Sequence, residues 1–138
     1  FTLIHDVILV TGLYALLGHL FGLQVNSVFI VAILTVIGYS VNDTIVIFDR
    51  IRENNLKFSS SSISQNINRS INESITRSLG TSITTLLVLL SMLLLGGSTL
   101  RDFLVVLILG VIVGTYSSIF VASQFLVFWE QGFRNKNL

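Results

Sequence analysis

The chain has 138 residues, of which 52% are hydrophobic and 11% are charged, and its mean hydropathy is +0.85. This composition excludes an ordinary soluble domain and predicts a membrane protein. The net charge of +1 is too small to indicate a nucleic-acid partner, and the absence of cysteine excludes disulfides and thiolate metal sites. Proline is also absent, which favours long, unbroken helices.

Four apolar segments lie at about 1–21, 26–49, 79–96 and 102–129. Each is near or above the roughly 20 residues that a helix needs to cross a hydrocarbon core of about 30 Å. The connections within the first pair and within the last pair are tight, whereas the connection between the pairs is long and polar. We therefore expect an all-α membrane protein with a single domain over residues 1–138, in which four transmembrane helices form two hairpins.

The polar connection carries an aliphatic repeat. Ile63, Ile67, Ile71, Ile75 and Leu79 recur every fourth residue, with polar side chains between them. This period predicts an amphipathic helix over about 62–78. We expect the helix to lie on the cytoplasmic membrane interface and to run into the third span; a plain solvated linker helix is the alternative.

Basic residues predict the orientation of the four spans, because cytoplasmic loops are enriched in lysine and arginine. Those in or beside the long connection are Arg50, Arg52, Lys57, Arg69 and Arg77, and Arg134 and Lys136 follow the last span. Only Arg101 lies at the opposite side. The connection and the C-terminus are therefore expected to be cytoplasmic.

The second span contains Asn42 and Asp43 within the segment GYSVNDTIVIFDRIREN at 38–54. A charged side chain at bilayer depth costs about 2.5–3.5 kcal/mol on insertion scales, so Asp43 is a candidate functional residue. Such a carboxyl must be neutral, paired with a cation or open to water. A buried carboxyl beside a movable cation is the basic element of a proton relay. A static polar pair that fixes helix packing is the alternative.

Three further residues are predicted to assist Asp43. Tyr39 lies four residues earlier on the same helix face, and Asn42 flanks that face. Arg77 lies at the entry of the third span, from which its long side chain can reach into the bundle. We expect Arg77 to be the cationic partner, and ordinary snorkelling at the interface is the alternative.

His5 and Asp6 form a second polar pair near the start of the first span. A histidine within reach of a carboxylate suits proton handling, and a hydrogen-bonded pair that faces the bundle is equally compatible with the sequence. No third ligand recurs at metal-binding spacing, so we expect no metal site.

The last span carries small residues on one face. Gly110 and Gly114 stand four residues apart, and Ser117 and Ser118 follow a turn later. Small side chains allow two helices to approach closely in a membrane. The sequence therefore assigns these four positions to helix packing.

Four segments together resemble the SecD/SecF family of the bacterial Sec protein-export machinery, a branch of the resistance-nodulation-division (RND) superfamily. They are GYSVNDTIVIFDRIREN at 38–54, the His5–Asp6 pair, SITTLLVLLSMLLLGG at 82–97 and GVIVGTYSSIFVASQ at 110–124. The resemblance covers nearly the whole chain, in order. It implies the last four of the six helices of a SecF-type subunit.

The resemblance further implies a non-enzymatic accessory subunit in the bacterial plasma (inner) membrane, where the proton-motive force assists preprotein export. Its expected partners are a SecD-like subunit, the SecY/SecE/SecG channel, the preprotein and the bilayer, and it needs no cofactor apart from protons as the coupling ion. By motif position, the family's proton-path residues fall on Asp43 and Arg77. The alternatives are the membrane half of an RND-type exporter of small molecules and a purely structural scaffold.

Overall fold

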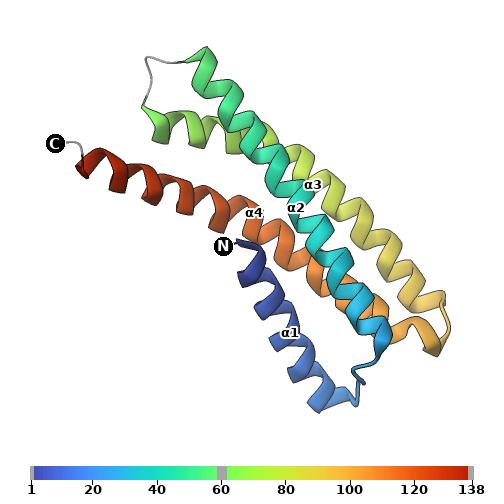
Figure 1. Cartoon of the computed structure of the whole chain (residues 1–138). Helices are drawn as coiled ribbons and strands as arrows, with labels where there is room; N and C mark the ends of the chain where they lie inside the picture. The colour runs from blue at the N-terminus through green and yellow to red at the C-terminus, as the bar shows by residue number, and fades with distance from the viewer. Residues whose placement is uncertain (1, 59–61, 137–138) are drawn as a thin grey trace.

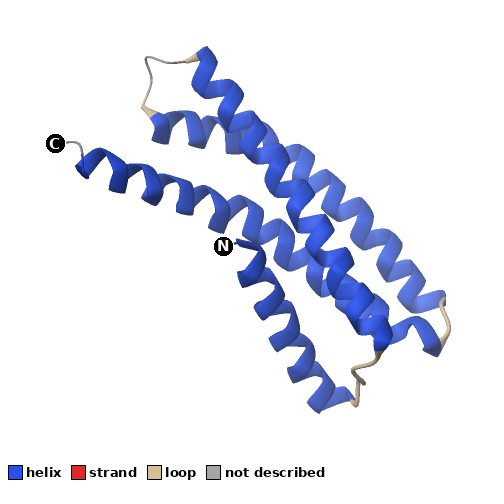
Figure 2. Cartoon of the chain, in the orientation of Figure 1, coloured by secondary structure: helices blue, strands red, loops and turns tan. Residues whose placement is uncertain are grey.

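The computed structural model describes residues 2–58 and 62–136, without the side chains of residues 122 and 129–136. Its helices are α1 (Thr2–Phe21), α2 (Ser27–Lys57), α3 (Ile63–Leu95) and α4 (Arg101–Lys136), with a short 3-10 helix, η1 (Ser98–Leu100), before α4 (Figures 1 and 2). The described part contains no strand, and all four long helices are apolar enough to cross a membrane. The predicted all-α membrane class is confirmed. The basic side chains predicted after the last span lie outside the described side chains.

Local sequence signals determine where the helices begin and end. Asn26 caps α2 by accepting hydrogen bonds from two backbone amides of the first turn, at 3.1 Å each. Ser62 and Gln65 form a capping box at the start of α3. Gly22 follows α1 with a φ of +69°, a left-handed conformation that glycine adopts without strain. The tight turn between α1 and α2 therefore follows from the local sequence.

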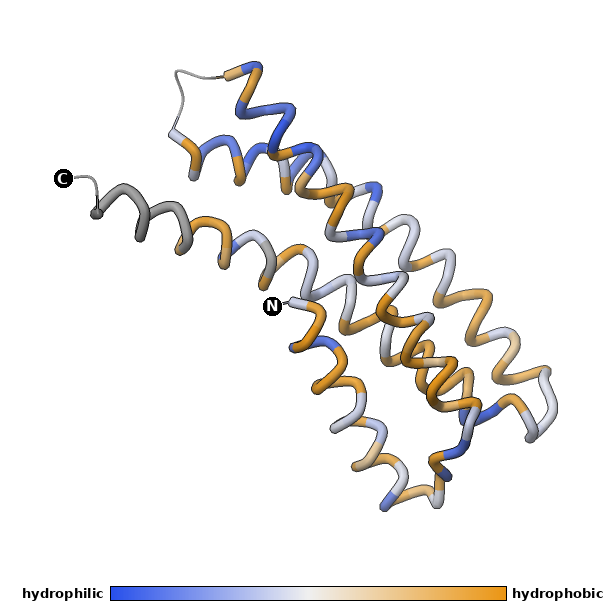
Figure 3. Tube along the Cα trace, in the orientation of Figure 1, coloured by the Kyte–Doolittle hydropathy of each residue, from blue (hydrophilic) through white to orange (hydrophobic). Residues whose placement is uncertain are grey.

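The second and third predicted spans are parts of longer helices. With 31 and 33 residues, α2 and α3 are roughly 46 and 50 Å long at 1.5 Å per residue, well beyond the thickness of a hydrocarbon core. Their polar halves lie side by side at one end of the molecule (Figure 3). The connector helix predicted over 62–78 is thus the first half of α3, with no break before the span.

The aliphatic repeat of this first half packs largely inside the bundle. A buried cluster consists of Ile47, Ile51, Ile67 and Ile119, with Ile71 and Ile75 packed against it. The expectation that the repeat faces the membrane interface therefore does not hold for Ile67, which is covered by α2 and α4. Ile63 and Leu79, at the two ends of the repeat, are exposed. Their contact with the membrane surface stays a prediction.

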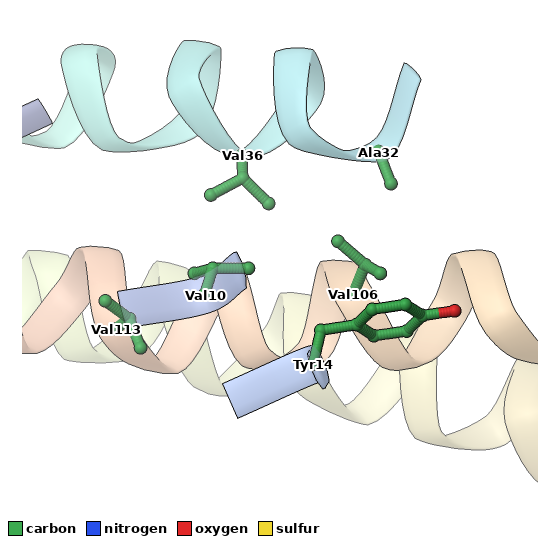
Figure 4. Close-up of a cluster of buried hydrophobic side chains, with 6 residues drawn as sticks. All are labelled: Val10, Tyr14, Ala32, Val36, Val106 and Val113. Carbon is green, nitrogen blue, oxygen red and sulfur yellow. The ribbon is translucent and has the colours of Figure 1, made fainter. Parts of the chain in front are cut away.

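Helix α4 is the centre of the bundle. It makes the most extensive interfaces with α2 and α3, and α1 packs more on α4 than on α2, its neighbour in sequence. A buried cluster of Val10, Tyr14, Ala32, Val36, Val106 and Val113 joins α1, α2 and α4 (Figure 4). Large apolar side chains remain exposed on the outer surfaces of α1, α2 and α3, as a surface that faces lipid requires.

Candidate functional site

Asp43 lies where α2 meets α3 and α4, and its carboxylate accepts a hydrogen bond from each of these helices. The Ser78 hydroxyl of α3 donates to Oδ1 at 2.8 Å, and the Ser118 hydroxyl of α4 donates to Oδ2. Ser78 and Ser118 are buried, whereas Asp43 is half-buried. The sequence assigned Ser118 to helix packing alone, and the structure places its hydroxyl on the carboxylate.

A chain of hydroxyl groups continues from this carboxylate along α3 and α4. Ser82 lies one turn after Ser78, and its hydroxyl lies 2.9 Å from that of Tyr39 and 2.5 Å from that of Thr115. The Ser82 hydroxyl also donates to the Ser78 carbonyl at 2.9 Å. Apart from half-buried Tyr39, these side chains are buried. Tyr39 thus bonds to α3 and makes no side-chain hydrogen bond with Asp43 among the described residues, so its predicted support of Asp43 stays a prediction.

Asp43 belongs to a close interface between α2 and α4 that repeats every turn. A Cβ atom on Gly110 would lie 2.0 Å from a Val36 methyl carbon, so only glycine fits this first layer. One turn further, a Cβ atom on Gly114 would lie 3.4 Å from Cβ of Ser40. The contact between Asp43 and Ser118 forms the third layer. The small residues therefore bring α4 close enough to α2 for a serine hydroxyl to reach the carboxylate.

A second buried carboxylate joins α1 to the same turn of α2. Asp6 is 1% exposed, accepts a hydrogen bond from the Ser40 hydroxyl and lies 3.1 Å from Nδ1 of His5. One turn of α2 thus contacts the three other long helices. Tyr39 bonds to α3, Ser40 bonds to α1, and Asp43 bonds to both α3 and α4. Both carboxyl groups therefore bond at this turn of α2.

The structure does not bring Arg77 into contact with Asp43. Arg77 is exposed and makes no ion pair with any residue that the structure describes. Its side chain borders a polar cavity of about 300 Å³, whose other lining residues are Val46, Asp49, Arg50, Glu53, Glu73 and Ser74. Val46 and Ser74 lie about one turn beyond Asp43 and Ser78. The cavity therefore begins close to the half-buried Asp43 carboxylate, on the side predicted to be cytoplasmic.

The polar halves of α2 and α3 are joined by a charged network that borders this cavity. Arg50 contacts Glu73 at 2.8 Å and Glu53 at 2.5 Å. Asn54, which is 2% exposed, donates to the Ser70 hydroxyl at 2.8 Å and to Glu73 at 3.0 Å. Exposed ion pairs contribute little on their own, so the buried amide is the more important contact. The network holds the two extensions together.

Two other predicted residues have side chains that make no hydrogen bond within the described part of the chain. Asn42 is exposed on α2, and its predicted support of Asp43 stays a prediction. Ser117 is fully buried, and its hydroxyl finds no partner among the described residues. It contributes a small side chain to the interior of the bundle.

The sequence contains a signal for the buried serine hydroxyl groups of α3. Ser70, Ser74, Ser78 and Ser82 recur every fourth residue and are all buried. Serines on a helix that crosses a membrane can lie in a close interface between helices. The prediction for residues 62–78 rested on the aliphatic repeat instead.

Comparison with known proteins assigns the chain to a family. A family model described as "Protein export membrane protein SecD/SecF, C-terminal" matches residues 1–132. The chain belongs to the SecD/SecF family. Within this family it is 48% identical over 128 residues to the protein translocase subunit SecF of Thermobaculum terrenum, an alignment that covers 93% of this chain and 40% of that protein.

Other members of the SecD/SecF family agree in sequence and in fold. The protein translocase subunit SecF of Anaerolinea thermophila is 46% identical, over 94% of this chain and 42% of that protein. A crystal structure titled as SecDF, a translocon-associated membrane protein from Thermus thermophilus, superposes with a TM-score of 0.86 at 47% identity, over 94% of this chain and 18% of that one. The chain thus spans about two fifths of the SecF relatives that it matches.

Proposed function

We propose that this chain forms the membrane-embedded part of an accessory subunit of the Sec machinery, which uses the proton-motive force to assist preprotein export across a bacterial plasma membrane. The observation that carries the proposal is the Asp43 carboxylate, which receives hydroxyl donors from α3 and α4 within the membrane domain. Relatives at 46–48% identity that are named as translocase subunits support the link to export.

Protonation of Asp43 changes how α2 is held. An ionised carboxylate only accepts hydrogen bonds, so Ser78 and Ser118 can both donate to it, as in this structure. A protonated carboxyl is uncharged and carries a donor of its own, so the two serine hydrogen bonds weaken and one of them can reverse its direction. Proton binding therefore rearranges the contact of α2 with α3 or with α4. This rearrangement is the proposed step that couples proton movement to a change in shape.

Arg77 and the polar cavity form the proposed exit toward the cytoplasm. Arg77 and Asp49 line the cavity together with Val46 and Ser74, which lie about one turn from Asp43 and Ser78. Water in such a cavity can accept a proton from the carboxyl. The long side chain of Arg77 can move from the cavity toward the ionised carboxylate and stabilise its charge. In this proposal Arg77 acts in a state other than the one described.

The proposed partners are a SecD-like subunit and the SecY/SecE/SecG channel. The name of one relative supports a SecD-like partner. The protein translocase subunit SecDF of Thermus thermophilus is 48% identical over 91% of this chain. The alignment covers only 17% of that longer protein, so most of it lies outside the segment compared here. Copurification of the natural full-length protein from its membrane, followed by mass spectrometry, tests both partners.

The decisive test replaces Asp43 with asparagine, which keeps the size of the side chain and removes the titratable group. The natural full-length protein is reconstituted with its channel, and preprotein export is measured with and without a proton gradient. Asp43→Asn should abolish the stimulation by the gradient while insertion and assembly stay intact. Asp102→Asn, at the opposite end of the bundle, is the matched control and should retain the stimulation. Stimulation that persists in Asp43→Asn would contradict the proposal.

A further inference from the structure

Asp6 is a second intramembrane carboxyl group that the proton path described above does not use. It is 1% exposed and lies 15 residues before the end of α1, roughly 22 Å along the helix at 1.5 Å per residue. This depth is within a hydrocarbon core of about 30 Å. A carboxylate at that depth needs a cation, a proton or water.

The contacts of Asp6 provide only one group that can supply a proton. Its partners are the His5 ring nitrogen and the Ser40 hydroxyl. No charged group of α2, α3 or α4 forms an ion pair or a hydrogen bond with Asp6 in the described residues. The His5 side chain is 33% exposed, so the ring joins the buried carboxyl to the surface. His5 and Asp6 are therefore suited to share one proton.

We propose that Asp6 is a second proton-binding group of this domain, which exchanges its proton through His5 and transmits its protonation state to the Asp43 turn of α2 through Ser40. This inference rests on the proposed function for its role in export. The existence of the proton site itself does not depend on that function.

The exchange can be written with the proton followed from atom to atom. A protonated Asp6 donates its O–H to Nδ1 of a neutral His5 ring, and transfer of the proton leaves a carboxylate and an imidazolium. The imidazolium then releases the proton of Nε2 to water at the exposed edge of the ring. The neutral ring that remains carries its hydrogen on Nδ1 and donates it to the carboxylate. Histidine suits this role because its unperturbed pKa is near 6.5.

Ser40 connects this exchange to Asp43. Its hydroxyl donates to the Asp6 carboxylate, and its backbone lies one turn before Asp43 on α2. Ser40 also forms the second layer of the α2–α4 interface, where it faces Gly114. When Asp6 takes up a proton on Oδ1, which lies next to His5, Oδ2 becomes an uncharged carbonyl oxygen and accepts the Ser40 hydrogen bond more weakly. The contact between α1 and α2 then changes next to the turn that holds Asp43.

Infrared difference spectroscopy of the natural full-length protein in lipid nanodiscs tests the inference directly. Spectra recorded across a pH titration in H₂O and in D₂O report the carbonyl stretch of each protonated carboxylic acid. We expect one titrating carboxylic-acid band to be lost in Asp6→Asn and retained in Asp43→Asn and in the control Asp102→Asn. Ser40→Ala should shift this band without removing it, because the acid loses a hydrogen-bond partner. His5→Phe should slow its exchange with D₂O.

The outcomes separate this inference from the proposed function. If Asp6→Asn leaves the titrating bands unchanged while Asp43→Asn abolishes the stimulation of export, Asp6 binds no proton and the proposed function stands. If the Asp6 band is present while Asp43→Asn keeps the stimulation, the proposed function fails and the second proton site stands. If Ser40→Ala does not change the frequency of the band, the proposed transmission through Ser40 is wrong. A Ser40→Ala protein that inserts and elutes as the wild type rules out a folding defect.

Discussion

Replacement of Gly110 by alanine should weaken the whole α2–α4 interface. The new Cβ atom would lie 2.0, 2.7 and 2.9 Å from the three side-chain carbons of Val36. Ordinary contact begins near 3.4 Å, so the closest pair is about 1.4 Å too close. Valine is stiff at χ1 in a helix and cannot turn away, which leaves separation of the two helices as the main relief. Overpacking of this kind costs about 1–3 kcal/mol.

The measurement is thermal unfolding of the natural full-length protein in lipid nanodiscs, with two matched controls. Gly38→Ala adds a methyl group where nothing lies within 4 Å, and Gly114→Ala adds one at the ordinary contact distance of 3.4 Å from Ser40. Alanine is favoured over glycine in a helix by up to about 1 kcal/mol, so Gly38→Ala should be neutral or stabilising. Gly110→Ala should be the least stable of the three, and Gly114→Ala should lie between them.

A second substitution identifies the cause. Val36→Ala removes the two methyl groups at 2.0 and 2.7 Å, so the double variant with Gly110→Ala should lose less stability than the sum of the two single variants. Strict additivity, or a Gly110→Ala protein as stable as Gly38→Ala, would refute the reasoning. Because Asp43 meets α4 two turns further along the same interface, Gly110→Ala should also reduce the stimulation of export by a proton gradient.

Three further substitutions test the contacts around the site and the ends of the helices. Ser118→Ala removes one of the two donors to Asp43 and should reduce, without abolishing, the stimulation of export by a proton gradient; an unchanged stimulation would show that this bond is dispensable. Asn54→Ala removes the buried amide that donates to Ser70 and Glu73 and should lower the free energy of unfolding by about 1–3 kcal/mol, measured by chemical denaturation in nanodiscs; a loss near zero would assign the α2–α3 contact to the exposed ion pairs. Asn26→Ala removes the cap of α2 and should cost about 1 kcal/mol in the same assay, whereas Asn26→Ser should cost little.

The sequence predicted those features that depend on residues close together in the chain. Composition and the lengths of the apolar segments predicted four membrane helices, and Asn26 stands where α2 begins. Asp43 could be selected because the cost of an intramembrane charge depends on depth, and depth follows from position in an apolar segment. The second span predicted to end at 49 is part of a helix that continues to Lys57, because a helix can leave the membrane without any break in its backbone. The position of the membrane boundary stays a prediction.

The sequence could not predict which residues of different helices contact each other. Arg77 was the expected partner of Asp43 because of its charge, yet the structure gives the carboxylate Ser78 and Ser118. These serines carry no charge, and the patterns to which they belong do not indicate which residue of another helix they contact. A hydrogen bond between helices depends on their distance and rotation, and the sequence around a single serine contains neither quantity. The role of Arg77 in a proton path stays a prediction.

The sequence by itself thus determined that this protein crosses a membrane with four helices and that Asp43 is an expensive carboxyl group within one of them. The tertiary structure alone decided what surrounds that group. Glycines of α4 let two backbones approach, and the serines of α3 and α4 then reach the carboxylate. The physical reason is the distance over which each effect acts. Hydropathy and helix propensity depend on residues that are close in sequence, whereas a hydrogen bond acts over about 3 Å between atoms that only packing brings together.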